Sequence, residues 1–426
     1  MSQHSPHAIV TLKPKRDQSI RRRHPWVFSG GIKHIQGQPE AGDWVEVRAN
    51  KGAVLGWGQF APGASIAVRM LSFSEIQPDD AWWNDMIQQA VQVRMALGLI
   101  DQAGQNCCRL VHAEGDGLPG LIADLYNGVL VIQCHTPGMH RHVDILVDAF
   151  RKALGDRLKG VYDKSAKTLA KNGGTPSHDG WIWGEAPKNH VAWEHGHQFV
   201  IDWEQGQKTG FFLDQRENRA LVGSLSRGKK VLNVFSYTGG FSIYALQGGA
   251  TEVHSLDASA RALEVGEDNV KLNGFDSRTH RSIHADALEY LKTEAMRDYD
   301  IVILDPPAFA KRASARHAAV QGYKRINLRA LQTMKPGSLL FTFSCSQAVD
   351  DALFSHTLVA AAIQAGRTVR ILHRLHQPPD HPVNVYHPEG SYLKGLVLRV
   401  DGEPVDTPSK EVDGSADDIT SMDSED

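Results

Sequence analysis

The chain of 426 residues contains few cysteines, and their spacing suits neither a disulfide framework nor a zinc site. Cys107 and Cys108 are adjacent, Cys134 stands alone, and Cys345 lies far downstream. There is no CxxC pair, and none of the 21 histidines is assigned to a metal. A reduced compartment is therefore expected, with Cys345 present as a free thiol.

Long hydrophobic runs are also missing. No apolar stretch approaches the roughly 20 residues of a transmembrane helix. The first ten residues, MSQHSPHAIV, lack the apolar core of a secretory signal. The 41% of hydrophobic and 22% of charged residues are typical of globular domains, so a cytoplasmic location is expected.

A strong charge of one sign is lacking too, because the net charge is only −3. The acidic excess comes from the end of the chain, where residues 403–426 hold nine acidic side chains and one lysine. This segment cannot bury a core, and its composition predicts a disordered acidic tail. The rest of the chain is mildly basic, which permits nucleic-acid binding without establishing it.

What the sequence does contain is three successive patterns, which predict three domains before the tail. Residues 8–76 hold short β-type segments separated by turns with Gly and Pro, and predict a small β-rich module. Residues 77–189 mix amphipathic helical segments with strands and predict a central α+β domain. Residues 190–402 alternate strands and helices, as in a doubly wound α/β sheet.

The β-rich module carries a basic run close to an aromatic residue. Arg21, Arg22 and Arg23 precede Trp26 by a few positions. Basic side chains suit a phosphate backbone and an aromatic ring suits a stacked base, so these residues are candidates for nucleic-acid contact. A solvated basic loop beside a core tryptophan is the alternative.

The α/β region places a glycine-containing turn and two acids where its first three strands should end. The turn FSYTGGFS follows a predicted strand at 231–235, and an aspartate ends each of the next two strands. Glycines allow close backbone approach to a ligand, and an acid at the next strand end can bind ribose hydroxyls. The turn is not the GxGxxG of dinucleotide enzymes, so an adenosine ligand without pyrophosphate is indicated, and S-adenosylmethionine fits best. The candidate cofactor-binding residues of these motifs are Phe235, Tyr237, Gly239, Gly240, Asp257 and Asp286.

Asp305 and Cys345 should leave the fourth and fifth strands beside this cofactor. A thiolate that adds to C6 of cytosine makes C5 nucleophilic enough to take a methyl group, and an acid at N3 stabilises the adduct. Cys345 is the candidate nucleophile and Asp305 the candidate acid, although position alone fits an inert buried cysteine equally well. The DPP motif also occurs in exocyclic-amine methyltransferases, but there an aromatic residue follows at once, whereas here Ala308 precedes Phe309.

Six segments together resemble the RlmI-type ribosomal RNA large-subunit cytosine-C5 methyltransferases. They are GQKTGFFLDQRENR, LNVFSYTGGFS, DASARALEVGEDNVKLNG, DPPAF, FSCS and HPEGSYLKG. The similarity runs from about residue 8 to residue 402. It implies an N-terminal PUA domain, a central α+β domain and a Rossmann-like class I methyltransferase domain. It also implies S-adenosylmethionine as cofactor and large-subunit (23S) ribosomal RNA as partner.

The resemblance also implies roles for single residues. Cys345 matches the nucleophile of the family and Asp305 its acid. Asp214 and Arg216, in the FFLDQR segment, are implied to line the methionine end of the cofactor site, and Lys208 to contact RNA.

The chain departs from many RNA cytosine-C5 methyltransferases at 306–308, where the sequence PPA lacks their second cysteine. Product release therefore cannot depend on a second thiol, and no residue is assigned as the base that removes the C5 proton. Two alternatives stay open: an RNA-binding or ribosome-assembly protein that keeps the fold without the chemistry, and an RNA base N-methyltransferase. Family membership is compatible with a homodimer.

Overall fold

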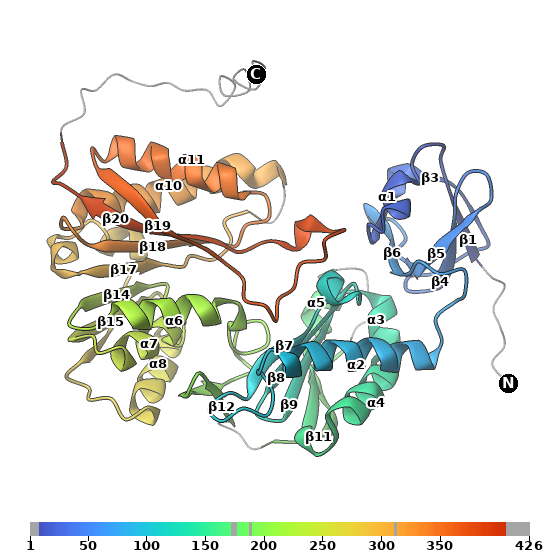
Figure 1. The fold of residues 1–426 in the computed structure, drawn as a ribbon, viewed down its shortest axis with the longest axis horizontal. Coiled ribbons are helices and arrows are strands. Elements are labelled where there is room, and N and C mark those ends of the chain that lie inside the picture. The colour runs from blue at the N-terminus through green and yellow to red at the C-terminus, as the bar shows by residue number, and fades with distance from the viewer. Residues whose placement is uncertain (1–7, 172–176, 187–189, 311–312, 406–426) are drawn as a thin grey trace.

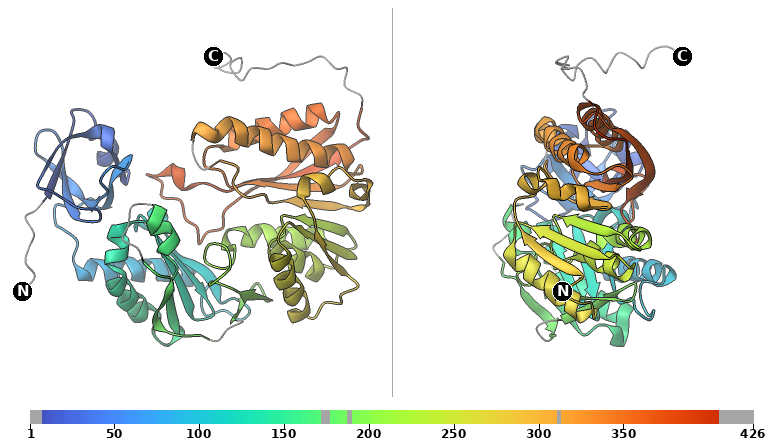
Figure 2. Two further views of the ribbon diagram at one scale, coloured as in Figure 1. Left: turned by 180° about the vertical axis from the view of Figure 1, so that it is seen from behind. Right: turned by 90° about the vertical axis from the view of Figure 1, so that its left-hand side faces the viewer.

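The computed structural model describes residues 8–171, 177–186, 190–310 and 313–405. These residues form four sheets, of six, five, two and seven strands, which follow one another along the chain (Figures 1 and 2). No helix in the described ranges is long and apolar enough to cross a membrane. The predicted tail lies outside the described residues from 406 onward, and the predicted domain limits stay predictions.

The first sheet has the strand order β2-β6-β5-β4-β1-β3, and one of its pairs, β1 with β4, is parallel. Four of its strands were predicted. The other two escape sequence analysis because β2, although apolar, has three residues, too few to show a period, and four of the five residues of β3 are exposed. The elements are β1 (Ala8–Leu12), α1 (Gln18–Arg21), β2 (Trp26–Phe28), β3 (Ile32–Gln36), β4 (Trp44–Arg48), β5 (Val54–Phe60) and β6 (Ile66–Ser72).

The second sheet has the order β11-β10-β9-β8-β7 and is covered by helices α2 and α4. Trp83 and Ile87 of α2 and Phe150 of α4 are fully buried in the core beneath the strands. The elements are α2 (Asp80–Ala96), β7 (Cys107–His112), β8 (Leu121–Tyr126), β9 (Val129–Cys134), α3 (Pro137–Arg141), α4 (Val143–Leu154), β10 (Gly160–Asp163), α5 (Ala166–Lys171) and β11 (Gly180–Gly184).

A two-stranded hairpin, β12 (His190–Glu194) and β13 (His197–Ile201), precedes the seven-stranded sheet. The large sheet has the order β16-β15-β14-β17-β18-β20-β19, and β20 runs antiparallel to both of its neighbours. Its elements are α6 (Arg216–Leu225), β14 (Lys230–Val234), α7 (Gly240–Gln247), β15 (Glu252–Asp257), α8 (Ala260–Leu272), β16 (His280–His284), α9 (Ala287–Tyr290), β17 (Ile301–Leu304), α10 (Arg316–Thr333), β18 (Leu339–Ser344), α11 (Asp351–Gln364), β19 (Thr368–His376) and β20 (Lys394–Asp401).

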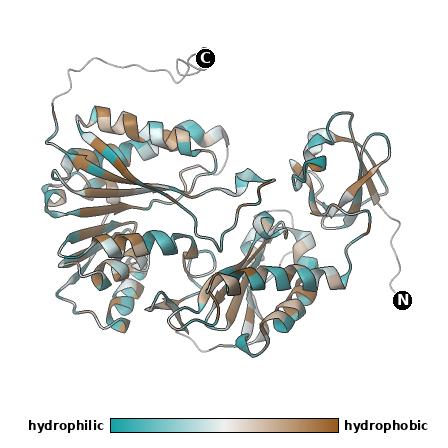
Figure 3. Ribbon diagram, viewed as in Figure 1, coloured by the Kyte–Doolittle hydropathy of each residue, from teal (hydrophilic) through white to brown (hydrophobic). Residues whose placement is uncertain are grey.

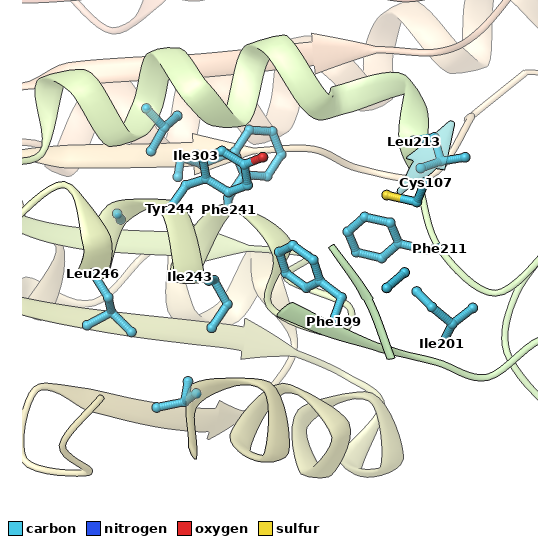
Figure 4. Packing of buried hydrophobic residues seen from close by; sticks show 14 of the residues in the cluster. Cys107, Phe199, Ile201, Phe211, Leu213, Phe241, Ile243, Tyr244, Leu246 and Ile303 are labelled. Carbon is cyan, nitrogen blue, oxygen red and sulfur yellow. The ribbon is translucent and has the colours of Figure 1, made fainter. Parts of the chain in front are cut away.

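Helices cover both faces of the large sheet, as predicted for a doubly wound fold. Side chains alternate between the faces along each strand. Ile301 and Ile303 of β17 therefore pack under α6, α7 and α8, while Val302 and Leu304 pack under α10 and α11. The central strands β17 and β18 are mostly apolar and the helices are two-faced (Figure 3). Phe241, Ile243 and Tyr244 of α7 fill the first of these cores (Figure 4).

A long excursion, residues 377–393, joins β19 to β20 and reaches the other two large sheets (Figure 1). The Asp380 carboxylate accepts the backbone N–H of Arg109 at 2.9 Å, and its carbonyl oxygen accepts the guanidinium of Arg94 at 2.8 Å. Further along, the His387 ring lies 4.3 Å from the Trp26 ring of the first sheet. The excursion therefore links the three large sheets.

Candidate active site

The predicted site residues follow strands whose carboxyl ends are in register. Val234 pairs with both Leu256 and Leu304, and Leu304 pairs with Thr342. The residues that follow these strands therefore emerge along one edge of the sheet. A cavity of about 430 Å³ opens there, within the roughly 300–1,000 Å³ range of small-molecule sites. Its lining includes Lys208, Asp214, Phe235, Tyr237, Gly240, Asp257, Asp286, Asp305 and Cys345.

The turn after β14 is held in a rare backbone conformation. Phe235 and Tyr237 have φ of 61° and 48°, a region that non-glycine residues adopt at a cost of about 1–3 kcal/mol. The Asp257 carboxylate offsets this cost, because one oxygen accepts the Tyr237 N–H and the other accepts the Ser259 N–H, both at 2.9 Å. Gly239, with φ of 80°, completes the turn as the N-cap of α7.

The lining of this turn suits an adenosine ligand. The hydroxyls of Ser236 and Thr238 are buried against the cavity and have no hydrogen-bond partner among the described residues. Buried polar groups are normally paired, so these two hydroxyls mark a place for ligand atoms. The Asp257 carboxylate retains free lone pairs for ribose hydroxyls. Asp286 is exposed, and its carboxylate caps α9 by accepting the Glu289 N–H at 3.0 Å. The residues present therefore fit S-adenosylmethionine.

The backbone around Cys345 is fixed by its two serine neighbours and by buried partners. The Ser346 hydroxyl accepts the Ala310 N–H at 3.2 Å and lies 2.9 Å from the Tyr323 hydroxyl. The Ser346 carbonyl oxygen accepts the Lys394 ammonium at 2.9 Å. All four cysteines are free, and Cys345 is the one that is not fully buried.

Burial and charged neighbours raise the pKa values of two acids of the site and leave that of a third below its ordinary value. Burial raises the pKa of Asp305 to about 7, and the neighbouring Asp214 carboxylate adds to the rise. Burial raises the pKa of the Cys345 thiol to about 11, with a further contribution from Asp305. Burial also raises the pKa of Asp214, but Lys208 and a 2.7 Å hydrogen bond from Tyr392 keep this pKa below its ordinary value.

Gln215 is a site residue that sequence reasoning missed. Its amide oxygen accepts the Asn218 amide at 2.6 Å, so its own NH₂ group is free to donate to Asp305. The signal was present, because Gln215 stands next to Asp214 in the FFLDQR segment, but no local pattern indicates that its partner is Asp305.

Arg216 does not reach the cavity, contrary to the role implied for it. Its guanidinium is fully buried and pairs with Asp380 of the excursion at 2.5 Å. Arg219, one helical turn later, lines the cavity instead and is held by Glu194 through two hydrogen bonds of 2.9 and 2.8 Å.

The basic run lies away from the cavity, on the first sheet. Arg21 pairs with Asp17 at 2.7 Å, while Arg22 and Arg23 are exposed. Trp26 is half-buried, and its indole N–H donates to Glu114 at 2.8 Å, so it joins the first sheet to the rest of the chain. The ring of Phe28, which follows the same basic run in the sequence, is 50% exposed and so more accessible than that of Trp26.

Comparisons with known proteins agree with this layout. The sequence profile of a family described as S-adenosylmethionine-dependent methyltransferase matches residues 108–399, and that of a PUA-like domain matches residues 10–73. Proteins named ribosomal RNA large subunit methyltransferase I are similar along their length. The one from Alteromonas mediterranea is 40% identical over 397 residues, and the one from Shewanella denitrificans 41% over 398. Each alignment covers 92% of this chain and 99% of the relative.

Two solved structures share the fold. One, described as a SAM-dependent methyltransferase from Streptococcus mutans, has a TM-score of 0.79 at 21% identity and covers 92% of this chain and 100% of its own. The other, a methyltransferase complexed with SAH, has a TM-score of 0.80 at 22% identity and covers 92% of this chain and 99% of its own. At these identities they support the fold alone.

Proposed function

The chain belongs to the S-adenosylmethionine-dependent methyltransferases, in the family of the ribosomal RNA large subunit methyltransferase I proteins, and we propose that it methylates C5 of one cytosine in large-subunit ribosomal RNA. The proposal includes a covalent bond between Cys345 and C6 of that cytosine. The observation that carries it is the position of Cys345 and Asp305 on one wall of the cofactor cavity, after neighbouring parallel strands.

The first step moves one proton from the protein to the base. Above pH 7 and below pH 11 the pair holds its proton on sulfur, because the pKa of Cys345 is about 11 and that of Asp305 about 7. Transfer from the thiol to the carboxylate costs about 5 kcal/mol for the difference of about 4 pKa units. Asp305 then donates this proton to N3 while the thiolate forms its bond to C6, which leaves C5 as an enamine carbon.

S-adenosylmethionine supplies an electrophilic methyl group when it is bound. Asp257 is proposed to hold the ribose hydroxyls, Asp286 the adenine amino group, and Asp214 the methionine end. After methylation, loss of the C5 proton expels the Cys345 thiolate, and N3 returns its proton through Asp305 to the sulfur, which restores the neutral ring and the thiol. The same thiol must attack and leave, because the other three cysteines are fully buried away from the cavity. Phe235, Tyr237, Gly239 and Gly240 are proposed to shape the cofactor turn.

The substrate has to present its base outside a helix. A stacked cytosine cannot reach Cys345, and sequence-specific RNA recognition favours loops and splayed bases. Arg22 and Arg23 on the PUA-like part are exposed cations suited to phosphates. A structured element of ribosomal RNA is therefore the proposed target.

The test uses labelled S-adenosylmethionine and deproteinised large-subunit RNA from cells that lack the gene. The wild-type protein should place one methyl group on C5 of one cytosine. Cys345→Ala should methylate at least about 10³-fold more slowly while still binding S-adenosylhomocysteine. Persistent activity in Cys345→Ala would exclude covalent catalysis by this thiol. A methyl group on a base nitrogen would favour the N-methyltransferase alternative. RNA binding without methylation would favour the assembly-protein alternative.

A further inference from the structure

Lys208 occupies a special place on the wall of the cofactor cavity. It lines the cavity together with Asp214, Asp305 and Cys345. Its ammonium lies 4.7 Å from the centre of the Phe212 ring, and it forms no ion pair within 4 Å with any described residue. A lysine that contacted only distant phosphates would have no reason to be fixed on this wall.

The backbone that carries Lys208 is held by several partners. Lys208 itself has φ of 50°, a conformation that costs about 1–3 kcal/mol and persists only where surrounding contacts impose it. The Tyr237 hydroxyl accepts the Gln207 N–H at 3.0 Å and donates to the Gly210 carbonyl at 3.3 Å. The Thr209 hydroxyl donates to Asp124 at 2.6 Å. The segment before and after Lys208 is thus fixed against the cofactor turn and the second sheet.

The other cations near Cys345 are already committed or face elsewhere. Arg219 is neutralised by Glu194 through two hydrogen bonds. Lys394 of β20 is buried, pairs in register with Ser344 and donates to the Ser346 carbonyl; it also lowers the pKa of Cys345, but less than Lys208 does. Arg325 lines the cavity from α10, but it is not among the largest influences on the pKa of Cys345.

We propose that Lys208 stabilises the Cys345 thiolate during attack on the base, as a positioning residue that acts through the sulfur by its charge. This inference rests on the proposed function of Cys345, and it gives Lys208 a role beyond the RNA contact that the sequence resemblance implies. Once Asp305 has taken the thiol proton, Asp214 is the carboxylate of the same cavity that still opposes the thiolate, and the charge of Lys208 offsets it.

The direction of the electrostatic effect agrees with this geometry. The positive charge of Lys208 lowers the pKa values of Cys345, Asp305 and Asp214, against the effect of burial on each. The charged and titratable groups that interact electrostatically with Cys345 are Asp305, Asp214, Lys208, Lys394, Tyr323 and Tyr392.

The test measures the thiol directly, without RNA or cofactor. Cys345 is the one cysteine with access to solvent, so alkylation of the folded full chain by iodoacetamide reports on it alone. Iodoacetamide is neutral, so its encounter with the site does not depend on the charge of residue 208. The variants are Lys208→Met, which keeps the stem on Phe212, Lys208→Arg, which keeps the charge, and Arg325→Met, which removes another cation from the same cavity.

At pH 8.5 we expect Lys208→Met to be alkylated about five- to tenfold more slowly than the wild type, which corresponds to a rise of about one pKa unit. Lys208→Arg should stay within about twofold of the wild type, and Arg325→Met should be unchanged. Equal rates for Lys208→Met and the wild type would overturn the proposal. So would a Lys208→Arg rate as slow as that of Lys208→Met, because packing rather than charge would then control the thiol.

Two internal controls keep the result interpretable. A variant that unfolds exposes the three buried cysteines, so a count of more than one reactive thiol identifies it. Lys208→Gln then replaces that variant in the comparison with the wild type. Because the assay contains no RNA, its outcome is independent of methylation. If the wild type methylates RNA but Lys208→Met is alkylated at the wild-type rate, this inference alone is refuted. Full methylation activity in Cys345→Ala would refute the proposed function.

Discussion

Asp305 and Cys345 are common side chains whose chemistry is set by their surroundings. A Pro-Pro pair follows Asp305, and proline cannot continue a ladder, so the carboxyl group is left at the strand end inside the cavity. Burial there keeps both groups protonated to higher pH than in water. The motif made both residues candidates, but their burial, and hence the shared proton, was visible only in the structure.

A pH-dependent stability effect is predicted for Asp305→Asn. The pKa of Asp305 in the folded protein, about 7, exceeds its ordinary value of 3.8, so the folded state loses stability as pH rises between these values. The variant should therefore be more stable than the wild type at pH 8, by about 1–4 kcal/mol, and equally stable at pH 4. Urea unfolding at both pH values measures this. The methylation rate of Asp305→Asn should be about 10²- to 10⁴-fold lower than that of the wild type. Destabilisation at both pH values would contradict the burial of an ionised Asp305.

At the scale of single elements, apolar strands were predicted well. The strand predicted at 231–235 is Lys230–Val234, and the fifth predicted strand, which should end beside Cys345, is Leu339–Ser344. Both are buried runs that end at clear signals. The hairpin β12–β13 was missed because it buries polar residues, and the fully buried Glu194 is stabilised there by distant partners, Arg219 and the Tyr244 hydroxyl. No local pattern contains such a pairing.

The same limit explains what was missed at the site. Arg216 and Arg219 lie on one helix, within the same motif, and sequence alone favoured the first as a cofactor contact. The structure directs Arg216 to Asp380, which is 164 residues away, and Arg219 to the cavity. Motifs identified the elements that form the site, whereas long-range ion pairs decided which side chains face it.

The turn after β14 should depend on both oxygens of Asp257. Asparagine has a single acceptor oxygen, so Asp257→Asn leaves one of the Tyr237 and Ser259 N–H groups without its partner. We expect the affinity for S-adenosylhomocysteine, measured by calorimetry, to fall about tenfold or more. Asp350→Asn is the matched control, because Asp350 caps α11 through one N–H and lies outside the cavity. An unchanged affinity in Asp257→Asn would show that the turn does not need the carboxylate.

Across the whole molecule, the excursion at 377–393 connects the PUA-like sheet to the methyltransferase sheet. Its beginning holds Asp380, buried between Arg216 and the second sheet, and its end holds Tyr392, which hydrogen-bonds Asp214 in the cavity. Breaking a buried ion pair of this kind costs about 3–5 kcal/mol. The arrangement fixes the PUA-like sheet relative to the cavity.

RNA binding should divide between these parts of the molecule. Replacing Arg22 and Arg23 with alanine should weaken RNA binding and make the slope of log K against log salt less negative by about 1–2, because each phosphate contact contributes close to one. Affinity for S-adenosylhomocysteine should not change. The control replaces Lys271 and Arg278, two exposed cations on the methyltransferase part. A salt slope equal to that of the wild type would place the RNA surface elsewhere.

The most direct measurement of the central claim is the capture of the covalent adduct with RNA that contains 5-fluorocytidine. Fluorine at C5 cannot be removed as a proton, so elimination of the thiolate is blocked after methyl transfer. We predict a protein–RNA complex that resists denaturation, and a peptide map that places the added mass on Cys345. Rapid methylation of normal RNA without any such adduct, or an adduct on another residue, would contradict the account.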